Sequence, residues 1–119
     1  MRVKKLLKTM LGLCGSTVVV DAELDETGSR PALLVWVRAK VRRRGRCGRC
    51  GELAGWYDRG GRPERESRRW RHLDVGYATC ELVAIAPRVD CVGCGVTVAG
   101  VPWARHGSSF TRAFEDLVC

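Results

Sequence analysis

Four of the seven cysteines form two short motifs of the same design. CGRCG (47–51) and CVGCG (91–95) each separate two cysteines by two residues and place a glycine after the second cysteine. This spacing lets both sulfurs turn towards one ion, and the glycine lets backbone amides face the thiolates. Four thiolates make a closed tetrahedral site, which is typical of structural zinc. The sequence therefore predicts one structural Zn(2+) ion with four ligands: Cys47, Cys50, Cys91 and Cys94.

Other uses of paired cysteines fit the sequence less well. A thioredoxin-like redox site has one CxxC at a helix start, whereas this chain has two in strand-and-turn surroundings. Two disulfides require an oxidising compartment, and an odd number of cysteines argues against a fully paired secreted scaffold. A rubredoxin-type iron site has similar cysteine turns, but a large arginine surface is not expected around it. A rubredoxin-like redox protein stays the less favoured alternative.

The remaining cysteines and the two histidines are predicted to lie outside the metal site. Cys80 falls in an apolar strand pattern and reads as a small buried hydrophobic residue, while Cys14 and Cys119 are interpreted as passive. Four cysteines already saturate zinc, so neither His72 nor His106 is needed as a ligand. His72 stands among arginines and is expected to be a polar packing residue or a phosphate contact.

Positive charge is concentrated in one third of the chain. The formal net charge is +8, and residues 38–71 alone hold thirteen basic and four acidic residues, a balance of +9. Such clustering is typical of a surface that binds a polyanion, and arginine is suited to phosphate and guanine. We predict DNA contacts from the arginines on both sides of the first cysteine pair: Arg42, Arg43, Arg44, Arg46, Arg49, Arg62, Arg65, Arg68, Arg69 and Arg71, with Arg59 in the same loop.

Aromatic residues stand between these arginines, and no catalytic grouping accompanies them. Trp56, Tyr57 and Trp70 are able to stack on bases, but packing in a small core is favoured for both tryptophans. Trp36 and Trp103 are also interpreted as packing residues. The acids in turn-like positions are isolated, and no phosphate loop or nucleophile–base pair is found. The chain is therefore not predicted to be an enzyme.

The elements that must position these residues are mostly short strands. Apolar residues at helical spacing predict a helix over 2–12, and the segments 17–24 and 32–41 predict a hairpin whose apolar face covers that helix. Further strands are expected near 53–57, over 68–73, as one long strand over 77–89, and over 96–101. A helix is expected to begin at 108 with serine caps. Residues 59–68 are predicted to be an exposed arginine loop.

Together these patterns predict a small α+β protein. We expect a zinc-ribbon-like antiparallel β domain with a short N-terminal helix and the start of a C-terminal helix. The expected divisions are an N-terminal helix and hairpin (1–44), a zinc-ribbon-like module (45–104) and the start of a truncated helical region (105–119). A bound metal is expected to stabilise the fold, because a chain of 119 residues with a single core is only marginally stable.

The start of the chain does not form a convincing secretion signal. Lys8 interrupts its apolar stretch, and no window approaches the length of a membrane span. A cytoplasmic protein without a membrane partner is predicted, in which reduced thiols are available to a metal.

The order of these features resembles the N-terminal part of bacterial insertion-sequence transposases of the ISL-three family. LLKTMLGL is followed by VVVDAELDETG, LLVWVRAKVRRRGRCGRCG, RRWRHLDVG, PRVDCVGCG and VPWARHGSSFTRAFEDLV. The resemblance implies a zinc-binding module with the four cysteines above as ligands, followed in such proteins by a helix-turn-helix and a DDE nuclease domain.

The resemblance also implies a function in DNA transposition. The expected partner is the terminal inverted-repeat DNA of the element, and transposase subunits are a further expected partner. Because the chain stops at Cys119, it is interpreted as a truncated transposase without its nuclease. The alternative from another class is a zinc-dependent protein–protein interaction module.

Overall fold

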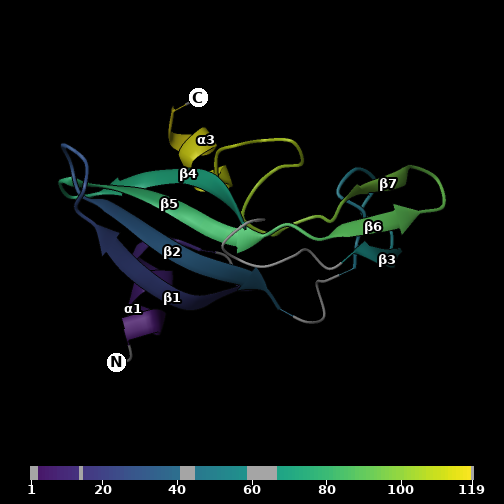
Figure 1. Cartoon of the computed structure of the whole chain (residues 1–119), viewed down its shortest axis with the longest axis horizontal. Coiled ribbons are helices and arrows are strands. Elements are labelled where there is room, and N and C mark those ends of the chain that lie inside the picture. The colour runs from purple at the N-terminus through teal and green to yellow at the C-terminus, as the bar shows by residue number, and fades with distance from the viewer. Residues whose placement is uncertain (1–2, 14, 41–44, 59–66, 119) are drawn as a thin grey trace.

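Two β-sheets lie end to end along the long axis of the molecule, whose extents are 45 × 29 × 29 Å (Figure 1). The computed structural model describes residues 3–13, 15–40, 45–58 and 67–118. The larger sheet has the order β1 (Thr17–Asp25), β2 (Ala32–Ala39), β5 (Ala78–Ile85) and β4 (Ser67–Val75). The smaller sheet has the order β3 (Gly55–Asp58), β6 (Arg88–Cys91) and β7 (Gly95–Val98).

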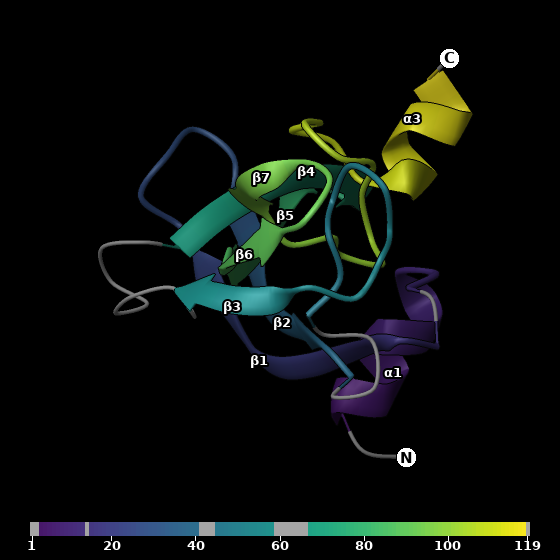
Figure 2. The same ribbon diagram turned by 90° about the vertical axis from the view of Figure 1, so that its right-hand side faces the viewer.

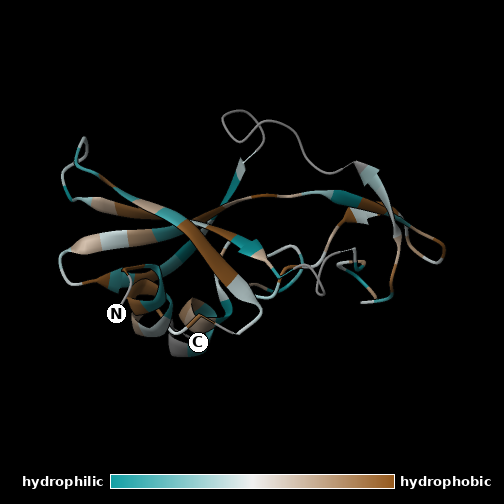
Figure 3. Ribbon diagram, turned by 90° about the horizontal axis from the view of Figure 1, so that it is seen from below, coloured by the Kyte–Doolittle hydropathy of each residue, from teal (hydrophilic) through white to brown (hydrophobic). Residues whose placement is uncertain are grey.

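Two helices complete the fold and lie on one face of the larger sheet (Figures 2 and 3). α1 (Val3–Met10) contacts β1, and α3 (Arg112–Val118) contacts β4 at the other edge. The predicted fold class is confirmed, because the strands are mostly antiparallel and a short helix lies at each end of the chain.

The larger sheet joins two hairpins through one parallel pair. β1 pairs with β2 and β4 pairs with β5, both antiparallel, while β2 and β5 run parallel with Val35 opposite Leu82. Trp70 of β4 faces Leu82 in turn, so the three side chains form a row across the sheet. All three are almost fully buried. Strands from both sides of the expected boundary at residue 45 thus share one sheet.

The core lies between this row and the chain segments that cover it. Leu11, directly after α1, and Trp103 and Ala104 pack against the buried face of the sheet. Trp70 and Trp103 meet edge to face with ring centroids 5.4 Å apart, a favourable aromatic geometry. The interpretation of Trp70 and Trp103 as packing residues is confirmed, and Trp70 is closed to any base.

The expected single strand over 77–89 is wrong. β5 ends at Ile85 and β6 begins at Arg88 in the other sheet, with Pro87 between them. Proline has no N–H to donate to a neighbouring strand, so it interrupts regular pairing at this point. Pro87 instead accepts a bond from the Ala99 amide at 2.9 Å, and the chain passes here from one sheet to the other.

The C-terminal helix begins later than predicted and has a different cap. α3 starts at Arg112, and the Phe114 amide donates to the Thr111 hydroxyl at 3.2 Å, which makes Thr111 the cap. Before the cap, the chain lies along the edge of β4: the Arg71 amide donates to Ser109 and the Thr111 amide donates to Arg71. This pairing fixes the position of Thr111 against the sheet.

His72 connects three parts of the chain beneath the larger sheet. It is 1% exposed, and its ring nitrogens contact the Leu11 carbonyl at 2.8 Å and the Thr111 hydroxyl at 2.7 Å. The carbonyl requires a donor at Nε2, so the neutral ring accepts the Thr111 proton at Nδ1. Burial lowers the pKa of His72, in agreement with the neutral form. His72 is a packing residue and does not reach solvent phosphate.

Candidate metal centre

The first cysteine motif forms the turn of a small hairpin before β3. Arg46 is bridged to Leu53, the Cys47 amide donates to Glu52 at 2.9 Å, and the Gly51 amide donates back to Cys47 at 2.9 Å. These bonds fold residues 47–51 into a tight loop. Both sulfurs of the motif are thereby presented on one side of it.

The second motif is the turn of the β6–β7 hairpin. Cys91 pairs with Gly95 in the antiparallel register, so residues 92–94 form the turn itself. The two turns are brought together by a bridge between Cys47 and Ala99, which follows β7. Pairing of β3 with β6 holds the two hairpins in the same sheet region.

Glycine is required after the second cysteine of each motif. Gly51 has φ +78° and Gly95 has φ +80°, a left-handed conformation that residues with a side chain rarely adopt. The predicted conformational role of these two glycines is confirmed. The backbone turn also places the Arg49 amide 3.4 Å from the Cys47 sulfur.

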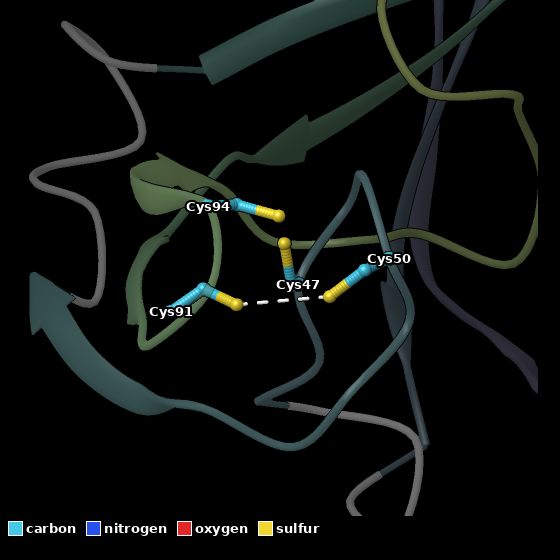
Figure 4. A group of neighbouring side chains, drawn as sticks. All are labelled: Cys47, Cys50, Cys91 and Cys94. Carbon is cyan, nitrogen blue, oxygen red and sulfur yellow. Dashed lines mark hydrogen bonds between the residues drawn. The ribbon is translucent and has the colours of Figure 1, made fainter.

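The four sulfurs converge on one point (Figure 4). All lie within 4.8 Å of one another, and the sulfurs of Cys50 and Cys91 are 3.6 Å apart. A tetrahedral zinc site with Zn–S bonds of about 2.3 Å separates its sulfurs by about 3.8 Å. The cysteines therefore fit a tetrahedral metal ion, and four close cysteines are able to hold one.

The electrostatics of the cluster favour a bound cation. Amide donors from Cys50 and Arg49 lower the pKa of Cys47 to about 7. The neighbouring sulfurs of Cys50 and Cys47 raise the pKa of Cys94 to about 12. The cluster thus accommodates one thiolate easily but resists further negative charge. A divalent cation removes this conflict, because metal binding releases the thiol protons.

A small apolar core supports the site. Cys47 and Cys91 are buried with Val89 and Ala99, and Trp56 packs against this group from β3. The packing interpretation of Trp56 is therefore confirmed. By contrast, Tyr57 is 57% exposed, and the Arg88 guanidinium lies over its ring with 5.0 Å to the centroid.

Cys80 lies far from this site in the fold. It is fully buried in the core of the larger sheet, and burial raises the pKa of its thiol to about 11. The prediction of a small buried hydrophobic residue is confirmed. Cys14 and Cys119 lie outside the described residues.

The structure divides the predicted DNA-contacting arginines into groups. Arg46 and Arg68 line one cavity beside the first cysteine turn, and Arg49 is exposed on that turn. Arg69 is next to Arg68 on β4, so its side chain points to the opposite face of the sheet. Six further arginines lie outside the described residues: Arg42, Arg43, Arg44, Arg59, Arg62 and Arg65.

Two of the predicted arginines are engaged by acids. Arg71 pairs with Asp74, and Arg69 lies 3.9 Å from Glu81. Arg30 also reaches Asp74, at 3.0 Å, and its guanidinium lowers the pKa of that carboxyl. Arg71 and Arg69 therefore already have partners on the exposed face of β4.

Sequence reasoning missed two basic residues that the fold brings to Arg46 and Arg68. Arg105 and Arg112 line the same cavity, as does His106. Arg105 and Arg112 stand outside the arginine-rich third of the chain. Only the return of the chain after β7 brings them near residue 46, and no spacing rule predicts that return.

Comparison with known proteins gives two related matches. No protein-family model matches the chain, and no solved structure matches it. The chain is 45% identical over 122 aligned positions to the transposase for insertion sequence element IS1557 from two strains of Mycobacterium tuberculosis, CDC 1551 / Oshkosh and ATCC 25618 / H37Rv.

The alignment covers the two proteins unequally. It includes 99% of this chain but 26% of each transposase.

Within the described residues, neither helix has the length and apolar character needed to cross a bilayer. Over nearly all its length, this chain is similar to about a quarter of an insertion-sequence transposase.

Proposed function

We propose that this chain is the zinc-stabilised DNA-binding module of an insertion-sequence transposase of the ISL-three family. The observation that carries the proposal is the convergence of Cys47, Cys50, Cys91 and Cys94 in a chain that is 45% identical to a transposase. Its zinc-ribbon-like part is the pair of hairpins that carry the two cysteine turns. The DNA that the module binds in this proposal is the terminal inverted repeat of the element.

Zinc is the proposed ion because of the ligand set. Four thiolates leave no open position for substrate or water, which is typical of a structural ion. Such an ion contributes on the order of 10–16 kcal/mol of apparent free energy in small peptides. Here it would hold together two turns that are otherwise joined by few backbone bonds.

The module has a positioning role in this proposal and no catalytic one. Among the described residues, the four cysteines are the group of metal-binding side chains found close together. Strand cleavage and joining are assigned to the nuclease domain of the transposase, outside these residues. The proposed contribution of this chain is to hold the element end by its phosphates and bases.

Metal analysis tests the first half of the proposal. Purified chain is expected to hold one zinc per molecule and to show no visible absorption. Stoichiometric iron with a visible charge-transfer band would support the rubredoxin-like alternative instead. The double variant Cys47→Ser/Cys91→Ser is expected to bind neither ion.

A binding titration tests the second half. Fluorescently labelled terminal-repeat duplex is titrated with zinc-loaded chain at several salt concentrations, beside a duplex of shuffled sequence. The expected result is tighter binding to the repeat and an affinity that falls steeply with salt, because phosphate contacts release counterions. Equal, salt-insensitive binding to both duplexes contradicts the DNA proposal and favours the protein–protein interaction module.

A further inference from the structure

A basic cavity lies where the first cysteine turn meets the chain that returns from β7. Its volume is about 210 Å³, and its walls come from residues 46–51, the start of β4, residues 98–107 and the first residue of α3. Four arginines line it, together with His106: Arg46, Arg68, Arg105 and Arg112. No aspartate or glutamate is among the lining residues that the structure describes.

Two of these arginines are fixed by the fold. Arg46 donates to the Gly51 carbonyl at 3.1 Å, and Arg68 donates to the Ser108 carbonyl at 2.8 Å. The guanidinium of Arg68 also lies 5.0 Å from the centre of the Trp70 ring. Because these contacts use neutral partners, neither positive charge is compensated by an acid within the described residues.

The cavity also has unused donors. The Nε atom of Arg46 is buried and has no hydrogen-bond partner among the residues that the structure describes. The side chain of Arg112 is exposed and makes no ion pair within that part of the chain. Buried donors without a partner cost about 1–3 kcal/mol, so a site of this kind favours an acceptor.

Arg105 differs from the others because it already has acidic partners. Its guanidinium lies 3.4 Å from Glu115 and 3.5 Å from Asp116 of α3. These contacts fix the start of α3 beside the cavity. Arg105 therefore has a positioning role, and the free charge of the cavity comes from Arg46, Arg68 and Arg112.

We infer that this cavity binds one backbone phosphate of the DNA, with Arg46, Arg68 and Arg112 as its contacts. This inference rests on the proposed function and goes beyond it, because it assigns one phosphate to one place. A phosphate oxyanion matches several guanidinium donors at once. The volume admits a phosphate group with some ordered water, since a water occupies about 30 Å³ in the liquid.

The salt dependence of DNA binding tests the inference. Arg112→Gln is the test variant, because this side chain has no hydrogen bond or ion pair to lose among the described residues. Arg30→Gln is the matched control: it removes the same charge from an exposed residue between β1 and β2, outside the arginines predicted to contact DNA. Losing one phosphate contact reduces the slope of log K against log salt by about 0.9.

The expected result is a smaller slope for Arg112→Gln and an unchanged slope for Arg30→Gln. Arg112→Lys is expected to recover most of the slope, because it restores the charge. Zinc content and melting temperature are measured for each variant, so a folding defect is recognised separately. Equal slopes for Arg112→Gln and Arg30→Gln would overturn the assignment of the phosphate to this cavity.

Two further outcomes separate this inference from the proposed function. Wild-type chain that binds no DNA contradicts the proposed function itself, whatever the variants do. In a separate arm, inorganic phosphate is added while backbone amide signals of Gly48 and Arg112 are followed by NMR. One result would overturn the inference that the phosphate comes from the DNA backbone: saturation by free phosphate, together with DNA binding that Arg112→Gln leaves unchanged. The cavity would then be a site for a small phosphate.

Discussion

At the scale of single residues, the four clustered sulfurs are chemically distinct from the buried thiol of Cys80. We expect Cys47→Ser to lower bound zinc from one ion per chain to none and to abolish the cooperative melting of the smaller sheet. Cys80→Ala removes a thiol of similar burial from the other core, so it is the matched control. It is expected to keep one zinc. Zinc is counted by atomic spectroscopy, and retention of zinc by Cys47→Ser contradicts the ligand assignment.

The second residue of the first cysteine motif has no room for a side chain. A Cβ at Gly48 would lie 2.6 Å from the Val98 carbonyl oxygen and would also meet the His106 ring, whereas one at Gly93 in the second motif meets nothing within 4 Å. Gly48→Ala is therefore expected to cost about 1–3 kcal/mol. Gly93→Ala should be nearly neutral. Urea unfolding of both zinc-loaded variants measures the difference, and equal losses would contradict the close approach.

His72 predicts a dependence of stability on pH. Burial holds its pKa in the folded protein below the ordinary value of 6.5. Below pH 6.5 the unfolded chain takes up a proton that the folded chain resists, so the free energy of unfolding falls as the pH decreases. The limiting slope for one proton is about 1.4 kcal/mol per pH unit. Above pH 6.5, where the ring is neutral in both the folded and the unfolded state, His72 does not lower the free energy of unfolding.

His72→Gln tests this origin. The variant is expected to be less stable at pH 7.5 but to lose less stability than wild type between pH 7.5 and 5.5. Bound zinc is measured at each pH, because protonation of the cysteines also releases metal. If the free energies of unfolding of wild type and His72→Gln fall in parallel with decreasing pH at constant zinc content, the effect belongs to another group.

Sequence spacing predicts the cysteine cluster but not the partners that make His72 a packing residue. Each cysteine pair is local, and the chemistry of four thiolates requires that they meet. His72 depends on partners 61 and 39 positions away, at Leu11 and Thr111. Neither partner contributes a side-chain type that singles it out. Arg105 and Arg112, which join the predicted Arg46 and Arg68 at the cavity, are unpredictable for the same reason.

At the scale of elements, Thr111 connects α3 to the larger sheet. Its hydroxyl accepts from the Phe114 amide and donates to His72, so Thr111→Ala removes a cap and leaves a buried ring nitrogen unpaired. We expect a loss of about 2 kcal/mol, from about 1 kcal/mol for the cap and a similar amount for the nitrogen. The exposed Ser109→Ala is the control and should stay within about 0.5 kcal/mol. Thermal unfolding monitored by circular dichroism compares them.

The errors in element bounds have local physical causes. Alternating apolar residues continue through 77–89, so periodicity alone gives one strand, and only the missing N–H of Pro87 explains the break. Three candidate caps stand within four residues before α3, and the pairing of residues 109–111 with β4 selects the last one. The start and end of a short helix depend more on the residues that it packs against than on its own sequence.

At the scale of the whole molecule, the two sheets are stabilised in different ways. The larger sheet has a closed core around Trp70 and Leu82. In the part of the chain that the structure describes, the buried core of the smaller sheet consists of Val89, Ala99 and two of the clustered cysteines. We expect removal of zinc by a chelator to unfold the smaller sheet and to leave the larger sheet folded. Hydrogen exchange measures this: amides of β6 and β7 should lose protection and those of β5 should retain it.

The parallel pairing of β2 with β5 has a consequence for how the chain reaches its fold. The hairpins form from neighbouring residues, but this pair joins positions 47 apart, such as Ala32 and Thr79. Contacts between distant positions slow folding, because loop closure must come first. An ion that joins Cys50 to Cys91 closes a loop over 41 positions in advance. Stopped-flow refolding should therefore be faster with zinc than with chelator. This result would mean that the bound metal sets the rate of assembly as well as its end state.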